Sequence, residues 1–287
     1  MKRNAIIMAA GTSSRFVPIS YERPKGLLEV KGEILIERQI RQLREAGIND
    51  ITIVVGYKAD MFQYLVEKYD VSLVYNNDYA IYNNTSSVIR VLDKLSNTFI
   101  CSSDNYFPNN VFMEESGESY YSALYAAGQT SEYCITTDED DLITDVTVGG
   151  HDSWYMIGHV YFNEIFSKRF SKFLEKDYEF QETKLGYWED VYIRHIKDLP
   201  LKIRRYGMDD IAEFDNLDEL RLFDNSYIKN TRSSVIKNIC RDYGWQEEQL
   251  YNFTKKKITE TELSFCFSVG NETYIYDNTQ EVKVERI

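Results

Sequence analysis

The segment of residues 5–25 constrains the fold more than any other part of the chain. Its apolar run ends at Gly11 and gives way to small hydroxylated residues, followed by Arg15 and Lys25. A short apolar run that ends this way predicts a buried strand leading into a loop. Glycine lets the backbone approach a ligand closely, and successive N–H groups of such a loop can donate to phosphate oxygens. Since a guanidinium and an ammonium lie in the same segment, we expect a phosphate-binding loop.

The spacing of this segment excludes two common phosphate loops. From Gly11 to Lys25 it is G-x-x-x-R-x-x-P-x-x-x-x-x-P-K. A Walker loop would need G-x-x-x-x-G-K-[ST], and a dinucleotide loop would need G-x-G-x-x-G after the strand. An ordinary structural turn is the alternative, but the register of the Arg, the Pro residues and the Lys disfavours it.

Predicted helices and strands alternate after this segment. Apolar spacing indicates helices over residues 33–46, around 61–66 and over 86–95, and strands over 51–56, 71–75 and 98–101. The alternation predicts an α/β fold with right-handed crossovers, a mostly parallel sheet, and a ligand site at the carboxyl ends of the strands. Beyond residue 110, shorter antiparallel strands are expected around residues 121–125, 133–136 and 154–162.

The last part of the chain differs from the rest. After about residue 228, the pattern predicts a helix over 233–243 and a hairpin of strands 263–269 and 272–276. This part has no catalytic constellation of its own. We therefore expect a main domain over residues 1–227 and a small C-terminal α+β appendage over 228–287.

Composition excludes several classes of function. The chain has 46 acidic and 33 basic residues and a formal charge of −13, which is no electrostatic footprint for nucleic acid. Its apolar runs are too short for a transmembrane helix or a signal peptide, and its four cysteines lack the spacing of a zinc site or a disulfide framework. We expect a cytoplasmic protein that neutralises bound phosphate locally, through Arg15, Lys25 and a divalent metal.

Two further stretches have side chains suited to a nucleotide site. Asp104 follows a predicted strand, where its carboxylate suits Mg²⁺, although an aspartate there can also cap a turn. The loop over residues 75–86 is rich in amides and phenols, which can recognise the edge of a pyrimidine, and Asn84 or Thr85 is expected to cap the next helix. Asp215 is expected to cap the helix that starts near Leu217, and a supporting role in the site is the alternative.

Taken together, these motifs resemble the nucleotidyltransferases that join a nucleoside triphosphate to a phosphorylated small molecule, over roughly residues 1–225. Within them, the chain is similar to the bacterial CTP:phosphocholine cytidylyltransferases of the LicC type. The resemblance implies a Rossmann-like three-layer α/β/α fold, Mg²⁺ as cofactor, and CTP and phosphocholine as substrates. The products would be CDP-choline and pyrophosphate.

The resemblance also implies residue roles. Lys25 and Arg15 would be catalytic, and the metal ligands would be Asp104 and Glu189, with Asp190 as a competitor because similar proteins have Asp-Asn at these two positions. The predicted nucleotide-binding residues are Ala9, Ala10, Gly11, Thr12, Ser13, Tyr79, Asn83, Asn84 and Ser103. A quaternary ammonium requires aromatic faces and nearby carboxylates. The predicted choline-binding residues are Glu132, Tyr133, Tyr161, Tyr187 and Trp188.

Other readings remain open at this level. The acceptor could be phosphoethanolamine, 2-aminoethylphosphonate or a sugar 1-phosphate, although the absence of a G-x-G-T-R loop disfavours the sugar. A non-catalytic nucleotide-binding module is disfavoured because Arg15, Lys25 and Asp104 are all present. Residues after 228 faintly resemble the opening of a choline-kinase-type lobe, which would imply a fused or partner choline kinase; a packing appendage is the alternative.

Overall fold

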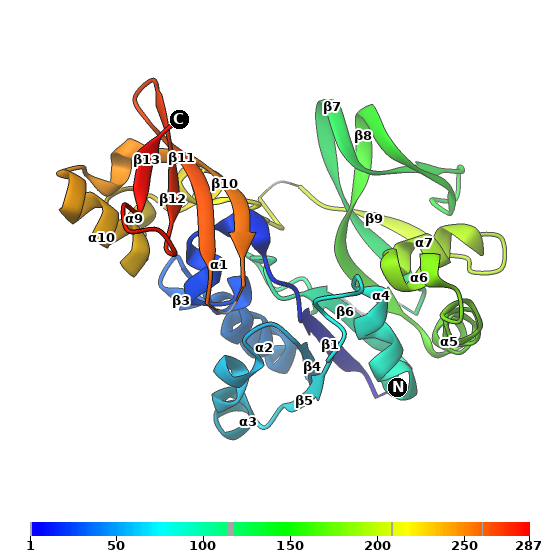
Figure 1. Cartoon of the computed structure of the whole chain (residues 1–287). Coiled ribbons are helices and arrows are strands. Elements are labelled where there is room, and N and C mark those ends of the chain that lie inside the picture. The colour runs from blue at the N-terminus through cyan, green and yellow to red at the C-terminus, as the bar shows by residue number, and fades with distance from the viewer. Residues whose placement is uncertain (1, 114–116, 208, 260) are drawn as a thin grey trace. The chain divides into compact units, whose positions relative to one another are not determined.

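The computed structural model describes residues 2–113, 117–207, 209–259 and 261–287. These residues form two compact units. The first comprises the residues up to Gly11 and Ile36–Ala212, and the second comprises Thr12–Leu35 and Glu213–Ile287; the colours of Figure 1 follow the residue numbers. The segment with Arg15 and Lys25 therefore shares a compact unit with the C-terminal region. The domain boundary expected between residues 227 and 228 stays a prediction.

A seven-stranded sheet forms the centre of the first unit, in the order β5-β4-β1-β6-β8-β7-β9. Its strands are β1 (Asn4–Ala9), β4 (Asp50–Val55), β5 (Ser72–Tyr75), β6 (Thr98–Ser102), β7 (Tyr120–Thr137), β8 (Ile143–Phe162) and β9 (Lys202–Arg205). Strand β1 pairs in parallel with β4 and β6, so that Ile7 lies opposite both Ile53 and Cys101. A strand covered on both faces requires a continuous apolar run, which is why residues 5–10 have one.

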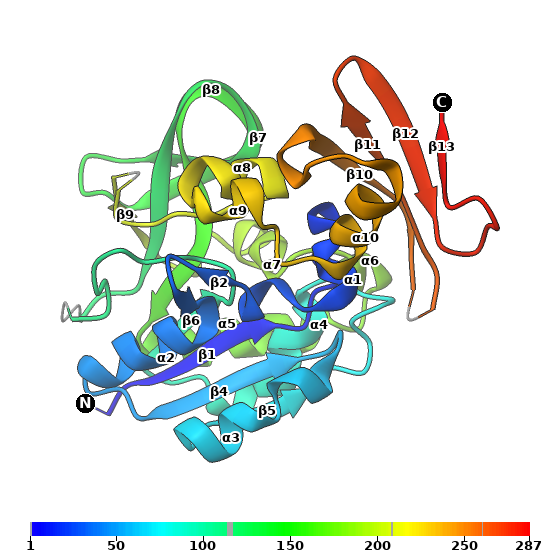
Figure 2. The ribbon, with the colours of Figure 1, turned by 90° about the vertical axis from the view of Figure 1, so that its left-hand side faces the viewer.

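The helices of this unit flank the sheet, as expected for an α/β fold. They are α2 (Leu35–Glu45), α3 (Tyr64–Tyr69), α4 (Thr85–Val88), α5 (Glu164–Asp177), α6 (Gln181–Leu185) and α7 (Trp188–Arg194), with 3₁₀ turns η3 (Ala59–Phe62) and η4 (Ile89–Lys94). Figure 2 shows β1, β4 and β5 side by side, with α3 beside β5. The expected mostly parallel sheet with flanking helices is confirmed. Among the described helices, none has the length and apolar composition needed to span a membrane.

Two predicted elements of this unit were wrong in detail. The helix expected over residues 86–95 is only α4, followed by the 3₁₀ turns of η4, where Val91 leaves helical geometry at φ −129°. This segment is rich in β-branched residues, which are stiff in a helix. The short strands expected after residue 110 are instead two long antiparallel strands, β7 and β8 (Figure 1). Their distal half is largely exposed and its register is shifted by bulges, so its polar residues resemble loops in sequence.

The second unit contains a four-stranded antiparallel sheet in the order β10-β11-β12-β13. Its strands are β10 (Leu250–Ile258), β11 (Leu263–Val269), β12 (Glu272–Asp277) and β13 (Val284–Arg286); a two-stranded ladder pairs β2 (Glu29–Val30) with β3 (Glu33–Ile34). The predicted hairpin, β11 with β12, is confirmed. The edge strands β10 and β13 were not predicted, because β10 has the lysine-rich composition common at sheet edges.

The helices of the second unit are short. They are α1 (Ile19–Glu22), α8 (Leu217–Phe223), α9 (Ser226–Lys229) and α10 (Ser234–Tyr243), with 3₁₀ turns η1 (Ser14–Phe16), η2 (Lys25–Leu27) and η5 (Glu247–Gln249). Helix α10 matches the predicted C-terminal helix. Its N-cap Ser233 accepts a hydrogen bond from the Ile236 N–H at 3.2 Å, and Gly244 ends it at φ 71°. The resemblance of this part to a choline-kinase lobe stays a prediction.

Strand β8 separates two cores on the faces of the seven-stranded sheet. Since successive side chains of a strand point to opposite faces, Val160 and Phe162 pack in one core with α5 and α7. His159 and Tyr161 point the other way and stack on the ring of Phe99. The position of an aromatic residue on β8 therefore decides which core it enters.

Candidate active site

The carboxyl end of β1 holds the beginning of the phosphate loop. Ala10 is 6% exposed, and its carbonyl oxygen accepts a hydrogen bond from the Tyr57 N–H at 3.0 Å. The ring of Tyr79 packs at this point, since a Cβ added to Gly56 would lie 2.8 Å from Tyr79 and 2.9 Å from the Ala10 oxygen. Only glycine fits at position 56. The structure thus brings Tyr79 to the start of the loop. Gly56, which follows strand β4 directly, makes room for this contact, and sequence reasoning missed it.

The second unit continues this loop with Thr12 and Ser13. Ser13 has left-handed geometry at φ 49° and leads into η1, which contains Arg15. The Arg15 side chain is 74% exposed and its Nη1 lies 2.6 Å from Oδ2 of Asp215. The guanidinium is therefore presented to solvent at a turn, where it could meet an anion.

Asp215 was expected to cap helix α8, and this prediction was wrong. The cap is the next residue, Asn216, whose side chain accepts a hydrogen bond from the Glu219 N–H at 3.0 Å. Because Asn216 satisfies the helix end, the carboxylate of Asp215 is available to pair with Arg15. Asp215 belongs to the environment of the phosphate loop and not to the helix cap.

Lys25 has a different setting from Arg15. It begins turn η2 and is 6% exposed, with its Nζ 5.7 Å from the ring centroid of Phe16. A buried ammonium keeps little conformational freedom, so Lys25 is held for a defined contact. Both cations predicted to bind phosphate lie in the second unit.

The amide-rich loop of the first unit is bonded to the start of helix α7. The Asn84 carboxamide accepts a hydrogen bond from the Trp188 N–H at 2.9 Å and donates to Oε2 of Glu189 at 3.4 Å. The Thr85 hydroxyl donates to the Gly186 carbonyl at 2.6 Å, and the Asn83 N–H donates to the Lys184 carbonyl at 3.1 Å. Asn84 holds the predicted N-cap position of α4, but its side chain makes no capping hydrogen bond there. The structure instead joins the predicted nucleotide loop to the predicted metal ligands.

Glu189 is a buried acid, 8% exposed, on the first turn of α7. Its Oε1 accepts a hydrogen bond from the Tyr121 hydroxyl at 2.9 Å. Burial raises the pKa of Glu189 to about 7, against hydrogen bonds from its own helix, Tyr121 and Asn84 that lower it. These donors favour the ionised form, which is the form that can bind a cation.

Asp190 has both carboxylate oxygens engaged. Oδ1 accepts a hydrogen bond from the Tyr133 hydroxyl at 2.9 Å, and Oδ2 accepts one from the Tyr187 N–H at 2.8 Å. Burial raises the pKa of the Tyr133 phenol, and the hydrogen bond to Asp190 adds to this shift, so the phenol stays protonated as the donor. Glu189 likewise accepts two hydrogen bonds, from Tyr121 and Asn84, so the number of bonds does not separate the two acids. Asp190 differs in being bonded to both members of the aromatic pair, Tyr133 and Tyr187.

The predicted choline-binding residues fall into two groups. Tyr133 and Tyr187 lie edge to face, with ring centroids 6.1 Å apart and planes at 78°, and Tyr187 is 45% exposed. Glu132, exposed, precedes Tyr133 on β7. Tyr133 and Tyr187 are both bonded to Asp190, whereas Glu132 is grouped with them because of its position on the strand.

Trp188 and Tyr161 are instead core residues. Trp188 is 3% exposed and stacks on the ring of Tyr121 at 5.8 Å. Tyr161 is 5% exposed, 4.9 Å from the ring of Phe99, in the core on the other face of the sheet. The structure does not bring these two side chains to Tyr133 and Tyr187, because the parity of the strand and of the helix turns them inward.

Asp104 lies two residues beyond the end of β6 and is partly buried. Ser103, 7% exposed, donates its N–H to the Met8 carbonyl at 3.0 Å, which fixes this turn beside β1. The buried Gln39 of α2 donates from Nε2 to the carbonyls of Ser102 and Asn105, each at 2.8 Å. Sequence reasoning missed Gln39, whose signal is a polar residue on the apolar face of a helix.

The donor chemistry of these residues fits Mg²⁺. Within residues 2–113, 117–207, 209–259 and 261–287, no group of three or more His, Cys, Asp or Glu side chains is arranged to hold a metal. Mg²⁺ at nucleotide sites takes one or two carboxylates together with phosphate oxygens and water. Asp104 and Glu189 could therefore supply the protein ligands, with the nucleotide completing the set.

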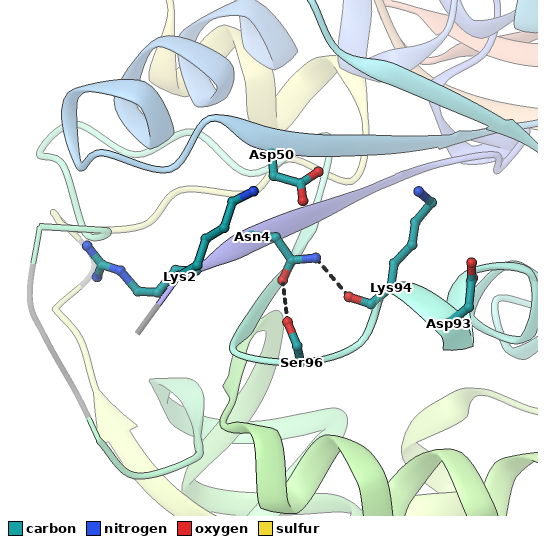
Figure 3. A pocket seen from close by; sticks show the side chains of 7 residues that line it. Lys2, Asn4, Asp50, Asp93, Lys94 and Ser96 are labelled. Atoms are coloured by element: carbon teal, nitrogen blue, oxygen red, sulfur yellow. Dashed lines mark hydrogen bonds between the residues drawn. The ribbon is translucent and has the colours of Figure 1, made fainter.

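A pocket of about 350 Å³ opens elsewhere, at the amino ends of β1 and β4 (Figure 3). The side chains lining it are Lys2, Arg3, Asn4, Asp50, Asp93, Lys94 and Ser96. Asn4 donates to the Lys94 carbonyl at 2.8 Å and accepts from the Ser96 hydroxyl at 3.4 Å. The residues predicted from the sequence as site residues do not line it, and ligands of such sheets bind at the carboxyl ends of the strands. We assign the site to the carboxyl ends.

Comparison with known proteins identifies the family of this chain. A family model for MobA-like NTP transferase domains matches residues 5–136. The chain is 36% identical to a 2-aminoethylphosphonate cytidylyltransferase of Lancefieldella rimae, over 81% of this chain and 96% of that protein. It is 34% identical to a choline-phosphate cytidylyltransferase of Streptococcus pneumoniae, over 76% of this chain and 95% of that protein.

A solved structure agrees with these matches. The CTP:phosphocholine cytidylyltransferase LicC of Streptococcus pneumoniae superposes with a TM-score of 0.76 at 33% identity, covering 79% of this chain and 99% of that one. The alternative of a non-catalytic module is therefore not retained. The chain belongs to the nucleotidyltransferases and, among them, to the cytidylyltransferases that act on phosphorylated acceptors.

Proposed function

We propose that the chain transfers the cytidylyl group of CTP to phosphocholine, giving CDP-choline and pyrophosphate. The observation that carries this choice of acceptor is the edge-to-face pair of Tyr133 and Tyr187 with Asp190 behind it. A quaternary ammonium has no proton to donate, so it is recognised by aromatic faces and by negative charge. A carboxylate whose oxygens already accept hydrogen bonds still supplies that charge.

The second candidate acceptor is 2-aminoethylphosphonate. It is favoured by the relative from Lancefieldella rimae and by the exposed Glu132 next to Tyr133. A primary ammonium donates hydrogen bonds and would need carboxylate acceptors more than aromatic faces. Phosphocholine would therefore depend more on the rings of Tyr133 and Tyr187, and 2-aminoethylphosphonate more on the carboxylates near them.

The proposed chemistry needs no general base. A phosphomonoester has a second pKa of about 6, so phosphocholine is largely a dianion at neutral pH and can attack the α-phosphorus of CTP in line. The bond to one phosphocholine oxygen forms as the bond to pyrophosphate breaks. The protein must bring two anions together and neutralise charge on the leaving group.

Each proposed residue has one part in this task. Arg15 and the N–H groups of the loop would hold the triphosphate, and Lys25 would neutralise the phosphates of both reactants. Tyr79, Asn83 and Asn84 are proposed to contact the nucleotide. Asp104 and Glu189 would hold Mg²⁺, which when bound supplies positive charge at the phosphates. Since Tyr161 and Trp188 are buried in the two cores, we leave them out of the proposed choline contacts.

A panel of substrates tests this proposal. Pyrophosphate release is measured for CTP, UTP, ATP and GTP, each with phosphocholine, phosphoethanolamine, 2-aminoethylphosphonate and glucose 1-phosphate. We expect the highest kcat/KM for CTP with phosphocholine. A higher kcat/KM for CTP with 2-aminoethylphosphonate would overturn the choice of acceptor, and a preference for another nucleotide would overturn the assignment to CTP.

A further inference from the structure

We propose that the C-terminal region positions the segment that carries Lys25, and that Glu22 is the positioning residue that couples the two. This inference rests on the proposed function, in which Lys25 and Arg15 bind the phosphates. It assigns a role to residues 228–235, for which the sequence suggested only a packing appendage or a kinase-like remnant.

Glu22 joins helix α1 to the beginning of helix α10. Its Oε1 accepts hydrogen bonds from the Ser233 hydroxyl at 2.8 Å, the Val235 N–H at 2.8 Å and the Ser234 hydroxyl at 3.1 Å. Its Oε2 accepts one from the Ser234 N–H at 3.0 Å. The first N–H groups of a helix lack partners within the helix and attract negative charge. One carboxylate from the segment thus satisfies the start of a helix from the C-terminal region.

Glu29 provides a second anchor through its backbone. Its carbonyl oxygen accepts hydrogen bonds from the Tyr227 hydroxyl at 2.8 Å and from Nη1 of Arg232 at 3.1 Å. The guanidinium of Arg232 also stacks 4.2 Å from the ring centroid of Tyr227. The backbone N–H of Lys31 donates to Oδ2 of Asp224 at 2.7 Å.

Lys25 lies between these two anchors. Turn η2 is closed by the Leu27 N–H donating to the Pro24 carbonyl and the Leu28 N–H donating to the Lys25 carbonyl, each at 3.0 Å. The backbone around Lys25 is therefore fixed on its N-terminal side by Glu22 and on its C-terminal side by Glu29. Transfer between two anions depends on a cation held in place before the reactants arrive, since a misplacement of 1 Å can cost about 100-fold in rate.

A second carboxylate in the same unit, which also accepts a backbone hydrogen bond, provides a matched control. Oε2 of Glu247 accepts hydrogen bonds from the Thr231 N–H and the Thr231 hydroxyl, each at 2.6 Å. This carboxylate accepts a backbone hydrogen bond just as Glu22 does, but its two partners both belong to Thr231, outside residues 12–35. If Glu22 only stabilised the fold, Glu22→Gln and Glu247→Gln would have the same consequences.

The experiment compares these two variants with the wild type in three measurements. Hydrogen exchange without substrate follows the backbone amides of residues 19–28, thermal unfolding gives Tm, and steady-state kinetics separate KM for CTP from kcat. In Glu22→Gln, only the carboxamide oxygen remains as an acceptor. We expect faster exchange over residues 19–28 and a rise of about 10-fold in KM for CTP, with a smaller change in kcat. Glu247→Gln is expected to lower Tm similarly while leaving exchange over 19–28 and KM unchanged.

Tyr227→Phe removes one hydrogen bond of the other anchor without a change of charge, and it serves if Glu22→Gln does not fold. It is expected to speed exchange over the same amides and to raise KM by about 3-fold, as a single neutral hydrogen bond is lost. Unchanged exchange over residues 19–28 in the folded anchor variants, or an equal rise of KM in Glu247→Gln, would overturn the inference. Normal turnover in Lys25→Ala would instead overturn the proposed function, whatever the exchange shows.

Discussion

The two compact units contribute groups of opposite charge to the proposed reaction. In the first unit, Glu189, Asp190 and Tyr133 are held by a large packed core and by hydrogen bonds to Tyr121 and Asn84. In the second unit, the cations lie on short turns whose backbone is bonded to the C-terminal region. The difference teaches that the acidic and aromatic groups owe their positions to core packing, whereas the cations owe theirs to a few polar contacts. Substitutions in the two units should therefore have different consequences for stability and activity.

The largest effect is expected in the second unit, at Lys25. Lys25→Ala removes a buried cation proposed to neutralise the phosphates, so kcat/KM should fall by about 10³-fold, as when a charge-stabilising group is lost at a transition state. Pyrophosphate release measures the rate, and circular dichroism shows whether the protein folds. Lys237→Ala, an exposed lysine of α10 in the same unit, is the control. A folded Lys25→Ala enzyme with near-normal turnover would break the comparison.

Asp104 is the corresponding test in the first unit. Asp104→Asn weakens a hard oxygen ligand, so we expect kcat to fall by about 10²-fold and the Mg²⁺ concentration for half-maximal rate to rise. Binding of Mn²⁺ in the presence of CTP, followed by electron paramagnetic resonance, gives a measure independent of turnover. Asp93→Asn, at the amino ends of the strands, controls for the loss of a carboxylate. The metal assignment fails if both variants bind Mn²⁺ as the wild type does.

His159 tests whether core packing determines the stability of the first unit. It is fully buried, and burial lowers its pKa to about 3, with Arg204 adding to the shift. The unfolded chain therefore takes up a proton below a pH of about 6.5 while the folded chain does not, so stability falls as the pH falls from 6.5 toward 3. At pH 5 the loss is about 2 kcal/mol, from about 1.4 kcal/mol per pH unit.

Urea unfolding at pH 7.5 and pH 5 measures this contribution. The other groups titrate equally in both proteins. Between the two pH values, the free energy of unfolding of His159→Gln should therefore fall by about 2 kcal/mol less than that of the wild type. His151→Gln, in an exposed ion pair with Asp152, should behave like the wild type. An equal loss in His159→Gln would mean that His159 is not held neutral in the core.

The smallest effect is expected for the aromatic pair. Tyr133→Leu removes one aromatic face, worth about 0.5–2 kcal/mol toward a cation, so KM for phosphocholine should rise about 10-fold. The rise should be smaller for phosphoethanolamine, whose ammonium can donate hydrogen bonds. Tyr125→Leu, on the same strand and partly exposed, controls for the loss of a tyrosine. Equal rises for both acceptors would show that the pair does not select the headgroup.

Local patterns predicted much of the fold. Strands β1, β4 and β6 were found because buried parallel strands are apolar throughout, and β5, partly exposed at the edge of the sheet, was found from its short apolar run. The loop after β1 was found because small residues and cations follow it at fixed spacing. The hairpin of β11 and β12 was found from its Gly270-Asn271 turn. The other edge strands, β9, β10 and β13, and the exposed half of β7 and β8 were not found, because exposed strands lack this apolar signal.

The environment of the candidate site could be predicted only in part. The position of Asp104 could be predicted, because it comes just after an apolar strand. The burial of Glu189 against Tyr121 and Asn84 depends on contacts between distant segments, which no local pattern encodes. Tyr161 and Trp188 were assigned to an aromatic cage, but a shift of one residue along β8 moves a side chain to the opposite face, and register is set by pairing. Asp215 differed from expectation because its neighbour Asn216 serves as the cap equally well.

The carboxamide of Asn84 has a further consequence. It accepts from the backbone at the start of α7 with one end and donates to Glu189 with the other, so a single planar group fixes two properties at once. Rotating it would present the wrong atom to both partners. The contributions of Asn84 and Glu189 to the free energy of unfolding are therefore not additive, because removing either side chain changes the contribution of the other. Two segments more than a hundred residues apart are thus coupled thermodynamically.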